Sequence, residues 1–499
     1  MSGGLRAAVA AMLVVFCAYV LARSPVVDVN HPALSESLAL FRVCFALLLW
    51  LRLQRLRPAL GVLWRRDRIL PWDRMLSLDR LITVWQGIAL ALAIGLLTPA
   101  AAGVSYLVGM YVFSRSHFYS IEEILFQIIS FFLIFLDTGR VGSLDAVLGL
   151  SLGLAMDTTL AVNLFWLALA VVMFSAGFEK LGSPIWRRGQ GFNCFVGLPH
   201  LVQKRFRFAR QWPRLGVWLS WATVVAELAL VLAALSAPLR VAMETILLGF
   251  AAGLILVVDF SFIGQALGLW LLLFLGLDVS GRFPGSTVGS GAVLQFDTPL
   301  GVIVLTAITL VVIRLLDVPA GWLSQVALRF TRWTVGMAPI RVFTEVHLYG
   351  VYLYRIVAQY LPGEQRDLMP AFDSDGGPGP FQCWYPRVFH GFMYPVSDLC
   401  LMVRRDGFEV AQGSARFRTV ADFVEGAFRG LRAEESVGLD RLLLYVRSID
   451  VSGETIGAVP RFSMSEWSPL LGFSVENGSL SGPTWLGLPP AVQKSARRV

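Results

Sequence analysis

Residues 160–176 read LAVNLFWLALAVVMFSA, and residues 177–186 continue as GFEKLGSPIW. The first run is apolar almost without interruption and approaches the roughly 20 residues that a helix needs to cross a bilayer. Glu179 and Lys180 follow this run after about one helical turn. The stretch therefore predicts a membrane-spanning helix with an amine near the edge of the hydrocarbon.

Lys180 has two interpretations at this position. Desolvation favours the neutral form of an amine, and a neutral lysine can act as a general base, whereas the neighbouring Glu179 favours the charged form. Lysines at the ends of spans also commonly extend to the lipid headgroups without a catalytic role. The spacing alone leaves both interpretations open.

The composition of the whole chain is that of a membrane protein. Hydrophobic residues make up 56% of its 499 residues and charged residues only 15%, which is outside the range of soluble globular domains. The net charge of +8 does not predict nucleic-acid binding, because the basic residues cluster between apolar runs, where they set topology. The five cysteines contain no CxxC pair and predict neither a metal site nor a disulfide framework.

Nine or ten apolar runs have the character of membrane spans, which predicts an all-α polytopic bundle. The run 5–22 ends in a sequence that resembles a signal-peptidase site, so it is either a first span or a signal peptide. The remaining runs are 37–53, 81–97, 100–113, 121–136, 160–178, 215–235, 241–258, 263–277 and 300–316.

The basic residues predict the orientation of these spans. Arginines are dense in the loop 52–74, and basic residues recur in 180–210, whereas 137–158 and 279–299 are nearly free of them. Because cytoplasmic loops carry the excess of lysine and arginine, we expect 52–74 and Lys180 on the cytoplasmic side.

The character of the chain changes after residue 316. Residues 321–333 have the pattern of an amphipathic surface helix, 342–354 and 442–449 resemble strands, and 419–431 has helical spacing. We therefore predict a small extramembrane α+β domain. The predicted divisions are 1–36, an N-terminal span or signal segment, 37–320, the transmembrane domain, and 321–499, the extramembrane domain.

Several polar residues lie inside or beside the apolar runs, where they are costly and informative. They are Arg42, His117, Glu122, Glu123, Gln127, Glu227, Glu244 and Asp259. Glu123 and Gln127 are four residues apart and should share one helix face. Together these groups predict a polar cavity that handles protons. The alternative is that they cap helices and pair with one another or with Arg42.

Five segments carry a resemblance to a known family. They are LALFRVCFALLL at 38–49, HFYSIEEILFQ at 117–127, SLD at 143–145, FSAGFEKL at 174–181 and AELALVLAAL at 226–235. In this order they resemble the membrane domain of vitamin K-dependent gamma-carboxylase and, with it, the HTTM (horizontally transferred transmembrane) family. The likeness covers about residues 37–280, and its most specific parts are AGxxKL and a histidine ten residues before a glutamine.

The resemblance implies roles for individual residues. The lysine of the family that deprotonates vitamin K hydroquinone matches Lys180, and the lysine before it is Glu179 here. The family histidine of the carboxylation step matches His117, with Ser116 in place of an asparagine. An enzyme of this kind would be a gamma-carboxylase-like lyase or monooxygenase, with Glu227 and Arg42 shaping its cavity.

The resemblance also implies partners and a location. We expect reduced vitamin K or another lipidic quinol, a protein substrate, and the lipid bilayer of a bacterial cytoplasmic membrane. The rival hypothesis is a non-enzymatic HTTM membrane protein that acts in maturation, export or transport. A transporter would depend on Glu122, Glu123 and Glu227 and tolerate the loss of Lys180. A membrane oxidoreductase subunit is disfavoured because the chain has no flavin, haem or CxxC motif.

Overall fold

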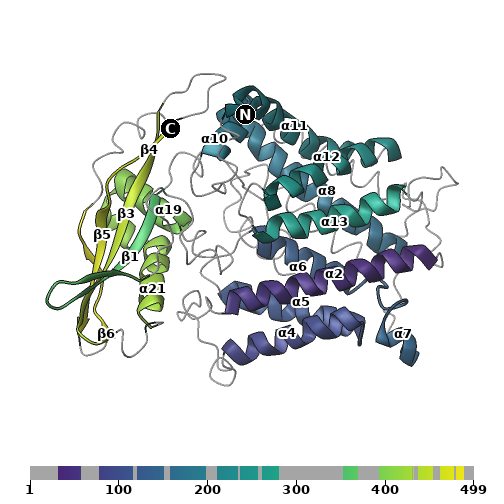
Figure 1. The fold of residues 1–499 in the computed structure, drawn as a ribbon, viewed down its shortest axis with the longest axis horizontal. Coiled ribbons are helices and arrows are strands. Elements are labelled where there is room, and N and C mark those ends of the chain that lie inside the picture. Colours follow the sequence, from purple (N-terminus) through teal and green to yellow (C-terminus); the bar gives the residue numbers. More distant parts are fainter. Residues whose placement is uncertain are drawn as a thin grey trace.

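The structure is a computed structural model with two groups of secondary structure. It describes residues 32–57, 78–115, 121–150, 158–197, 211–233, 236–256, 261–279, 352–368, 393–429, 431, 436–452, 461–476 and 479–487. Helices of the first group lie together, and a sheet with its own helices forms the second group (Figure 1, green to yellow).

The helices of the first group follow the predicted apolar runs. The long ones are α2 (Pro32–Leu56), α4 (Leu78–Ile94), α5 (Thr98–Arg115), α6 (Ile121–Leu133), α8 (Thr158–Gly182), α11 (Pro213–Leu232), α12 (Ala237–Leu256) and α13 (Ser261–Val279), and the short ones are α7 (Leu144–Leu148), α9 (Pro184–Arg187) and α10 (Gly191–Gly197). Every predicted run between 37 and 277 overlaps one long helix. The runs 5–22 and 300–316 lie outside the described residues.

Four of these helices are long and apolar enough to cross a membrane. Their apolar parts are Leu34–Leu56, Ala161–Gly182, Pro213–Leu232 and Pro238–Leu256. Shorter apolar helices occupy Thr98–Phe113, Glu123–Leu133 and Ile263–Val279. These findings support the membrane character of the chain, and the bundle of nine or ten spans remains a prediction.

Helix α8 is the centre of the helical group. In its apolar window 94% of the residues are buried inside the molecule, against 28% in the window of α12. Phe165 of α8 stacks on Trp270 of α13 with ring centroids 4.7 Å apart and contacts Phe132 of α6 at 5.0 Å. A helix that is apolar on all sides must be surrounded by other apolar groups, and the neighbouring helices provide them.

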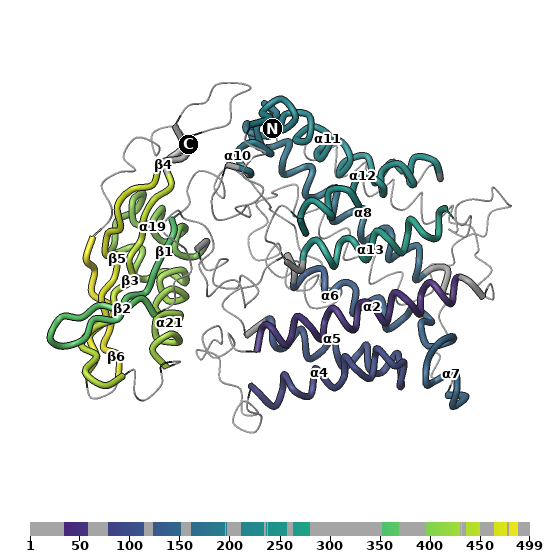
Figure 2. Tube along the Cα trace, viewed as in Figure 1, coloured from purple at the N-terminus to yellow at the C-terminus, as the bar shows by residue number. Residues whose placement is uncertain are grey.

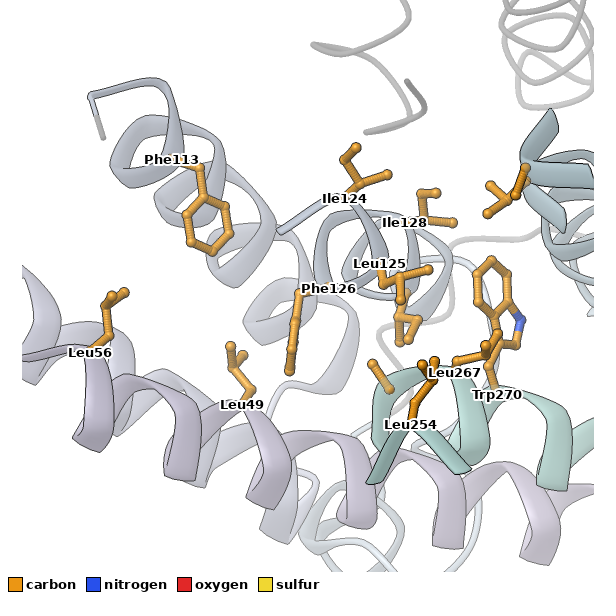
Figure 3. Packing of buried hydrophobic residues seen from close by; sticks show 14 of the residues in the cluster. Leu49, Leu56, Phe113, Ile124, Leu125, Phe126, Ile128, Leu254, Leu267 and Trp270 are labelled. Atoms are coloured by element: carbon orange, nitrogen blue, oxygen red, sulfur yellow. The ribbon is translucent and has the colours of Figure 1, made fainter. Parts of the chain in front are cut away.

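The other helices pack around α8 in adjacent pairs. Helix α11 packs on α8, α12 on α13, and α2 on both α4 and α13 (Figure 2). Figure 3 shows the apolar contact region between these helices. Leu49 of α2 lies beside Phe126 of α6, and Trp270 of α13 also lies near α6. These contacts bring polar residues of separate helices together.

Two helices continue past a charge at which the sequence predicts a loop. The run 37–53 was expected to lead into a basic loop at Arg52, but α2 continues to Leu56 and Arg52 is buried. The run 160–178 was expected to end before Lys180, but α8 continues to Gly182. In both places the predicted loop begins at a charge, whereas the helix continues because a charge does not break the backbone pattern.

The second group is an antiparallel sheet. Its strands are β1 (Tyr352–Tyr360), β2 (Gln365–Asp367), β3 (Leu439–Ser452), β4 (Arg461–Met464), β5 (Ser468–Glu476), β6 (Ser479–Leu480) and β7 (Thr484–Trp485). The seven strands run in the order β2-β1-β3-β5-β6, with β4 on β3 and β7 on β5. The expected strand at 442–449 is confirmed as part of β3.

Helices cover one face of this sheet. They are α19 (Met393–Asp406), α20 (Phe408–Gln412) and α21 (Ala415–Arg429), with α19 against β1 and α21 against β3 (Figure 1). Tyr352 N donates to Ser397 Oγ of α19 at 2.8 Å, and the Tyr354 ring meets Phe423 of α21 at 5.7 Å. The strand-containing C-terminal region is thus confirmed, whereas the amphipathic run 321–333 lies outside the described residues.

Candidate functional site

Lys180 and Glu227 form a buried ion pair between α8 and α11. Lys180 Nζ lies 2.5 Å from Glu227 Oε1 and 2.6 Å from Oε2. Each side chain is only 2% exposed. Lys180 therefore does not extend to a surface of the molecule, as a lysine that reaches for headgroups would, but turns inward to a carboxylate.

A glycine one turn earlier allows the two helices to approach. A Cβ on Gly177 would lie 2.9 Å from Glu227 Cβ and 3.1 Å from Leu228 Cγ, closer than side-chain carbons tolerate. Because Gly177 has no side chain, α11 can lie against the last turns of α8. Gly177 of the segment AGFEKL therefore permits the close helix packing that places Glu227 beside Lys180 Nζ.

One aromatic ring lies beside the pair. The Trp186 ring centroid lies 5.3 Å from Lys180 Nζ, within the range of a cation–π interaction. Trp186 belongs to α9, which starts at Pro184 directly after α8. Phe174 and Phe178 stack on the same helix as Lys180, with centroids 6.0 Å apart. The amine therefore has one acidic and one aromatic neighbour in an apolar setting.

This geometry allows a proton to move between two atoms without a change in net charge. A proton on Lys180 Nζ can transfer to Glu227 Oε1 or Oε2, which converts ammonium and carboxylate into amine and carboxylic acid. The net charge of the pair is zero in both forms. A single unpaired charge would cost far more free energy in this buried environment than either form of the pair. The pair can hold a proton in either form and can present a neutral amine.

Glu123 and Gln127 share a buried helix face, as their spacing predicted. Glu123 pairs with Arg52 of α2, and both side chains are buried. Gln127 packs against α5, where a Cβ on Gly109 would lie 2.3 Å from its Nε2. Glu123 is thus the partner of a cation on α2, and the structure does not join it to the Lys180–Glu227 pair.

Arg42 supports a turn rather than a carboxylate on another span. Its Nη1 donates to Thr138 O at 2.5 Å and its Nη2 to Gly142 O at 2.8 Å. The expected contribution of Arg42 to a cavity with Glu227 is therefore not seen. The arginine instead holds the segment between α6 and α7 against α2.

Asp145 of α7 completes this turn. It accepts hydrogen bonds from Leu97 N at 2.7 Å, Thr98 N at 2.7 Å and Thr98 Oγ1 at 2.8 Å. Burial alone would raise the pKa of Asp145, but the hydrogen bonds from Thr98 and Leu97, together with the charge of Arg42, hold it below its ordinary value. The SLD segment at 143–145 therefore stabilises the helix connection.

Two expected site residues lie outside the described part. They are His117 and the side chain of Glu122. Asp259, another polar residue of the apolar runs, also lies outside the described residues. Glu179 is half-buried on α8, about 100° around the helix from Lys180. Within the described ranges, histidine, cysteine, aspartate and glutamate do not form a group of three or more that could hold a metal ion.

A third buried ion pair joins two residues that the sequence does not single out as a pair. Arg240 of α12 donates to both oxygens of Asp278 on α13, at 2.8 to 3.2 Å. The predicted runs 241–258 and 263–277 stop one residue short of this pair on each side. One feature of the sequence could have predicted this pair. Arg240 precedes one apolar run and Asp278 follows the next, and two consecutive helices that pack as an antiparallel hairpin bring these two ends together.

Comparison with known proteins adds no assignment. No family model, curated protein or solved structure matches the chain. The likeness to the HTTM and gamma-carboxylase group therefore remains a prediction from the motifs, and the Lys180–Glu227 pair is the observation from which a function is argued.

Proposed function

We propose that the chain is a multi-pass membrane protein of the HTTM and gamma-carboxylase-like group, in which Lys180 is the base toward a lipidic quinol. The observation that carries this proposal is the contact of Lys180 Nζ with both oxygens of Glu227 in a fully buried setting. The proposed location is a bacterial cytoplasmic membrane, with a glutamyl-containing protein as the second substrate.

Lys180 and Glu227 act together in this proposal. Transfer of the Nζ proton to a Glu227 oxygen leaves a neutral amine, which then takes the proton of a quinol hydroxyl. The products are a quinolate, a lysine ammonium and a protonated Glu227, so the pair takes up one proton for each quinol that is deprotonated. Glu227 is thus the store for the proton that Lys180 must first lose.

The surroundings of Lys180 fit a quinol. The ring of Trp186, 5.3 Å from Nζ, gives the site an aromatic and apolar character that suits an aromatic substrate. A bound quinol supplies the reducing equivalents for oxygen chemistry, while the protein residues hold it and move the proton.

The proposal is tested by oxygen-dependent oxidation of vitamin K hydroquinone by the purified protein in detergent. The variants are Lys180→Ala and, as a matched control that removes an exposed cation, Arg57→Ala. We expect epoxide formation by the wild type and by Arg57→Ala, and at least a hundredfold lower rate in Lys180→Ala, because general bases contribute about 10²–10⁴-fold.

Two results contradict the proposal. Unchanged turnover in a normally inserted Lys180→Ala protein removes Lys180 from the reaction. Absence of turnover in the wild type removes the quinol and favours the non-enzymatic role in maturation, export or transport. In that case loss-of-function variants should fall on the carboxylates or on the C-terminal region and not on Lys180.

A further inference from the structure

A second cluster of buried ionisable side chains lies apart from the Lys180 site. It consists of Trp166 on α8, Arg240 and Glu244 on α12 and Asp278 on α13, named here the α12–α13 cluster. Each of these side chains is buried, and Glu244 is 0% exposed. Trp166 and Lys180 are separated by about 21 Å along the axis of α8, so the two sites occupy different parts of the central helix.

Asp278 takes the single cation of the cluster. Arg240 Nε donates to Asp278 Oδ2 at 3.0 Å, and Arg240 Nη2 donates to Asp278 Oδ1 at 2.8 Å. This paired arrangement is the strong form of an arginine–carboxylate contact. The charge of Arg240 is therefore balanced by Asp278.

Glu244 is the second carboxyl of the cluster, and it forms no salt bridge with any cation in the described part of the chain. Its Oε1 accepts a hydrogen bond from Trp166 Nε1 at 3.0 Å. Its Oε2 is buried and meets no hydrogen-bond donor among the described residues. Glu244 follows Arg240 on α12 by four residues, about one helical turn, and Arg240 holds Asp278 of the adjacent α13, so the two carboxyls share one buried cluster.

Two ionised carboxylates cannot form a hydrogen bond, because both are acceptors only. A contact between Glu244 and Asp278 therefore requires one proton between them. With that proton the cluster holds one cation and one anion and is neutral. Without it, the cluster carries a net negative charge in a fully buried, apolar environment, which proteins avoid.

We propose that the α12–α13 cluster is a proton-binding site, in which protonated Glu244 donates from Oε2 to Asp278. The ligand is the proton itself, and Trp166 and Arg240 fix the two carboxyls in place. Trp166 holds Oε1 and so leaves Oε2 to carry the proton, while Arg240 keeps Asp278 ionised as the acceptor. Among the described residues, Trp166, Arg240 and Asp278 are the polar and charged groups of α8, α12 and α13 that act on Glu244.

This site differs chemically from the Lys180–Glu227 pair. That pair has equal numbers of cations and carboxyls and needs no additional proton, whereas the α12–α13 cluster has one cation for two carboxyls. The helices α12 and α13 therefore carry a site that changes its charge when a proton enters or leaves. The inference does not depend on quinol chemistry at Lys180.

Infrared difference spectroscopy of the purified protein at neutral pH tests this proposal. The wild-type spectrum minus that of Glu244→Gln should show the C=O stretching band of a buried carboxylic acid, shifted in deuterated buffer. Glu123→Gln is the matched control, because Glu123 is equally buried but has Arg52 as its own cation. Its difference spectrum should show loss of carboxylate bands and no carboxylic-acid band.

Asp278→Asn provides an independent variant. It removes the anion from Arg240, so Glu244 should ionise and become the new partner of the guanidinium, with loss of the same carboxylic-acid band. This result supports the proposal even where Glu244→Gln folds poorly. A wild-type minus Glu244→Gln spectrum without a carboxylic-acid band overturns it, as does a band that persists unchanged in Asp278→Asn.

Discussion

Two ion pairs with similar contact distances lie in opposite environments in this molecule. Arg57 donates to both oxygens of Asp79 at 2.6 and 2.7 Å, and Lys180 contacts both oxygens of Glu227 at 2.5 and 2.6 Å. The first pair is 37% and 64% exposed, whereas each member of the second is 2% exposed. The distances are alike, so burial is what separates an incidental surface contact from a candidate site.

The largest effect is expected from breaking the buried pair. Glu227→Gln keeps the shape of the side chain but leaves the Lys180 ammonium without a counter-ion. Removal of one partner of a buried pair costs about 3–5 kcal/mol, and we expect this loss in the free energy of unfolding, measured by denaturant titration in detergent. A loss no larger than that of Asp79→Asn would show that the surroundings of Lys180 are hydrated.

An intermediate effect is expected at Asp145, which is buried but outside the long apolar helices. Asp145→Asn removes the charge that accepts three hydrogen bonds, at a cost of about 1.5–3 kcal/mol. Since the pKa of Asp145 is lowered in the folded protein, its contribution is present above the unfolded value and lost as pH falls through the folded one.

The pH dependence gives the check on this second prediction. Thermal unfolding midpoints of the wild type and Asp145→Asn should differ at neutral pH and converge as the pH falls below about 4. A difference between the two proteins that stays constant across this range would assign the effect to packing rather than to charge.

The third prediction concerns the close approach that creates the buried pair. Gly177→Ala places a methyl group 2.9 Å from Glu227 Cβ, and such overpacking costs about 1–3 kcal/mol. Gly103→Ala on α5 is the control, because a Cβ there meets nothing within 4 Å. Equal unfolding free energies for both variants would contradict the proposed contact of α8 with α11.

The smallest effect is expected at the exposed pair. The hydrogen bond from Arg57 lowers the pKa of Asp79, but both side chains are in contact with solvent and are screened by salt. Asp79→Asn should leave the denaturation midpoint of the protein unchanged within error, at low and at high salt. A clear loss of stability would mean that this connection of α2 to α4 is buried in the membrane-bound protein.

The sequence predicted the positions of the long helices but not the pairing of their charges. Apolar runs locate α8 and α11 because the local pattern of hydrophobic residues is sufficient for that purpose. The pairing of Lys180 with Glu227 is a contact between distant segments, and no local pattern encodes it. Glu123 and Gln127, in contrast, were placed correctly on one face because helical spacing is local.

The errors have a common physical cause. Four predicted boundaries stand at a charge, whereas the helix itself extends past that charge until a glycine, a proline or a turn ends it. The residues placed wrongly or missed for this reason are Arg52, Lys180, Arg240 and Asp278. All four are buried against a partner of opposite charge on another helix, and that partner is what makes a charge tolerable inside a span.

In the C-terminal region, only part of the sheet could be predicted. Strands β1 and β5 have nine residues each, but the predicted run 342–354 overlaps only the start of β1 and no run predicts β5. Strand β3 (Leu439–Ser452) is long and contains an aromatic and β-branched run, so part of it was recognised. Strands β6 and β7 span only two residues each, which is too short for any periodic signal. Their positions are determined by pairing with β5.

A double-mutant cycle at Lys180 and Glu227 is the most direct test of the central claim, that these residues form one buried proton-sharing unit. Lys180→Met and Glu227→Leu should each cost about 3–5 kcal/mol, whereas the double variant should be as stable as the wild type, since apolar replacement of a whole buried pair is often neutral. This folded double variant should have no quinol oxidation. Additive destabilisation, or an active double variant, would contradict the claim.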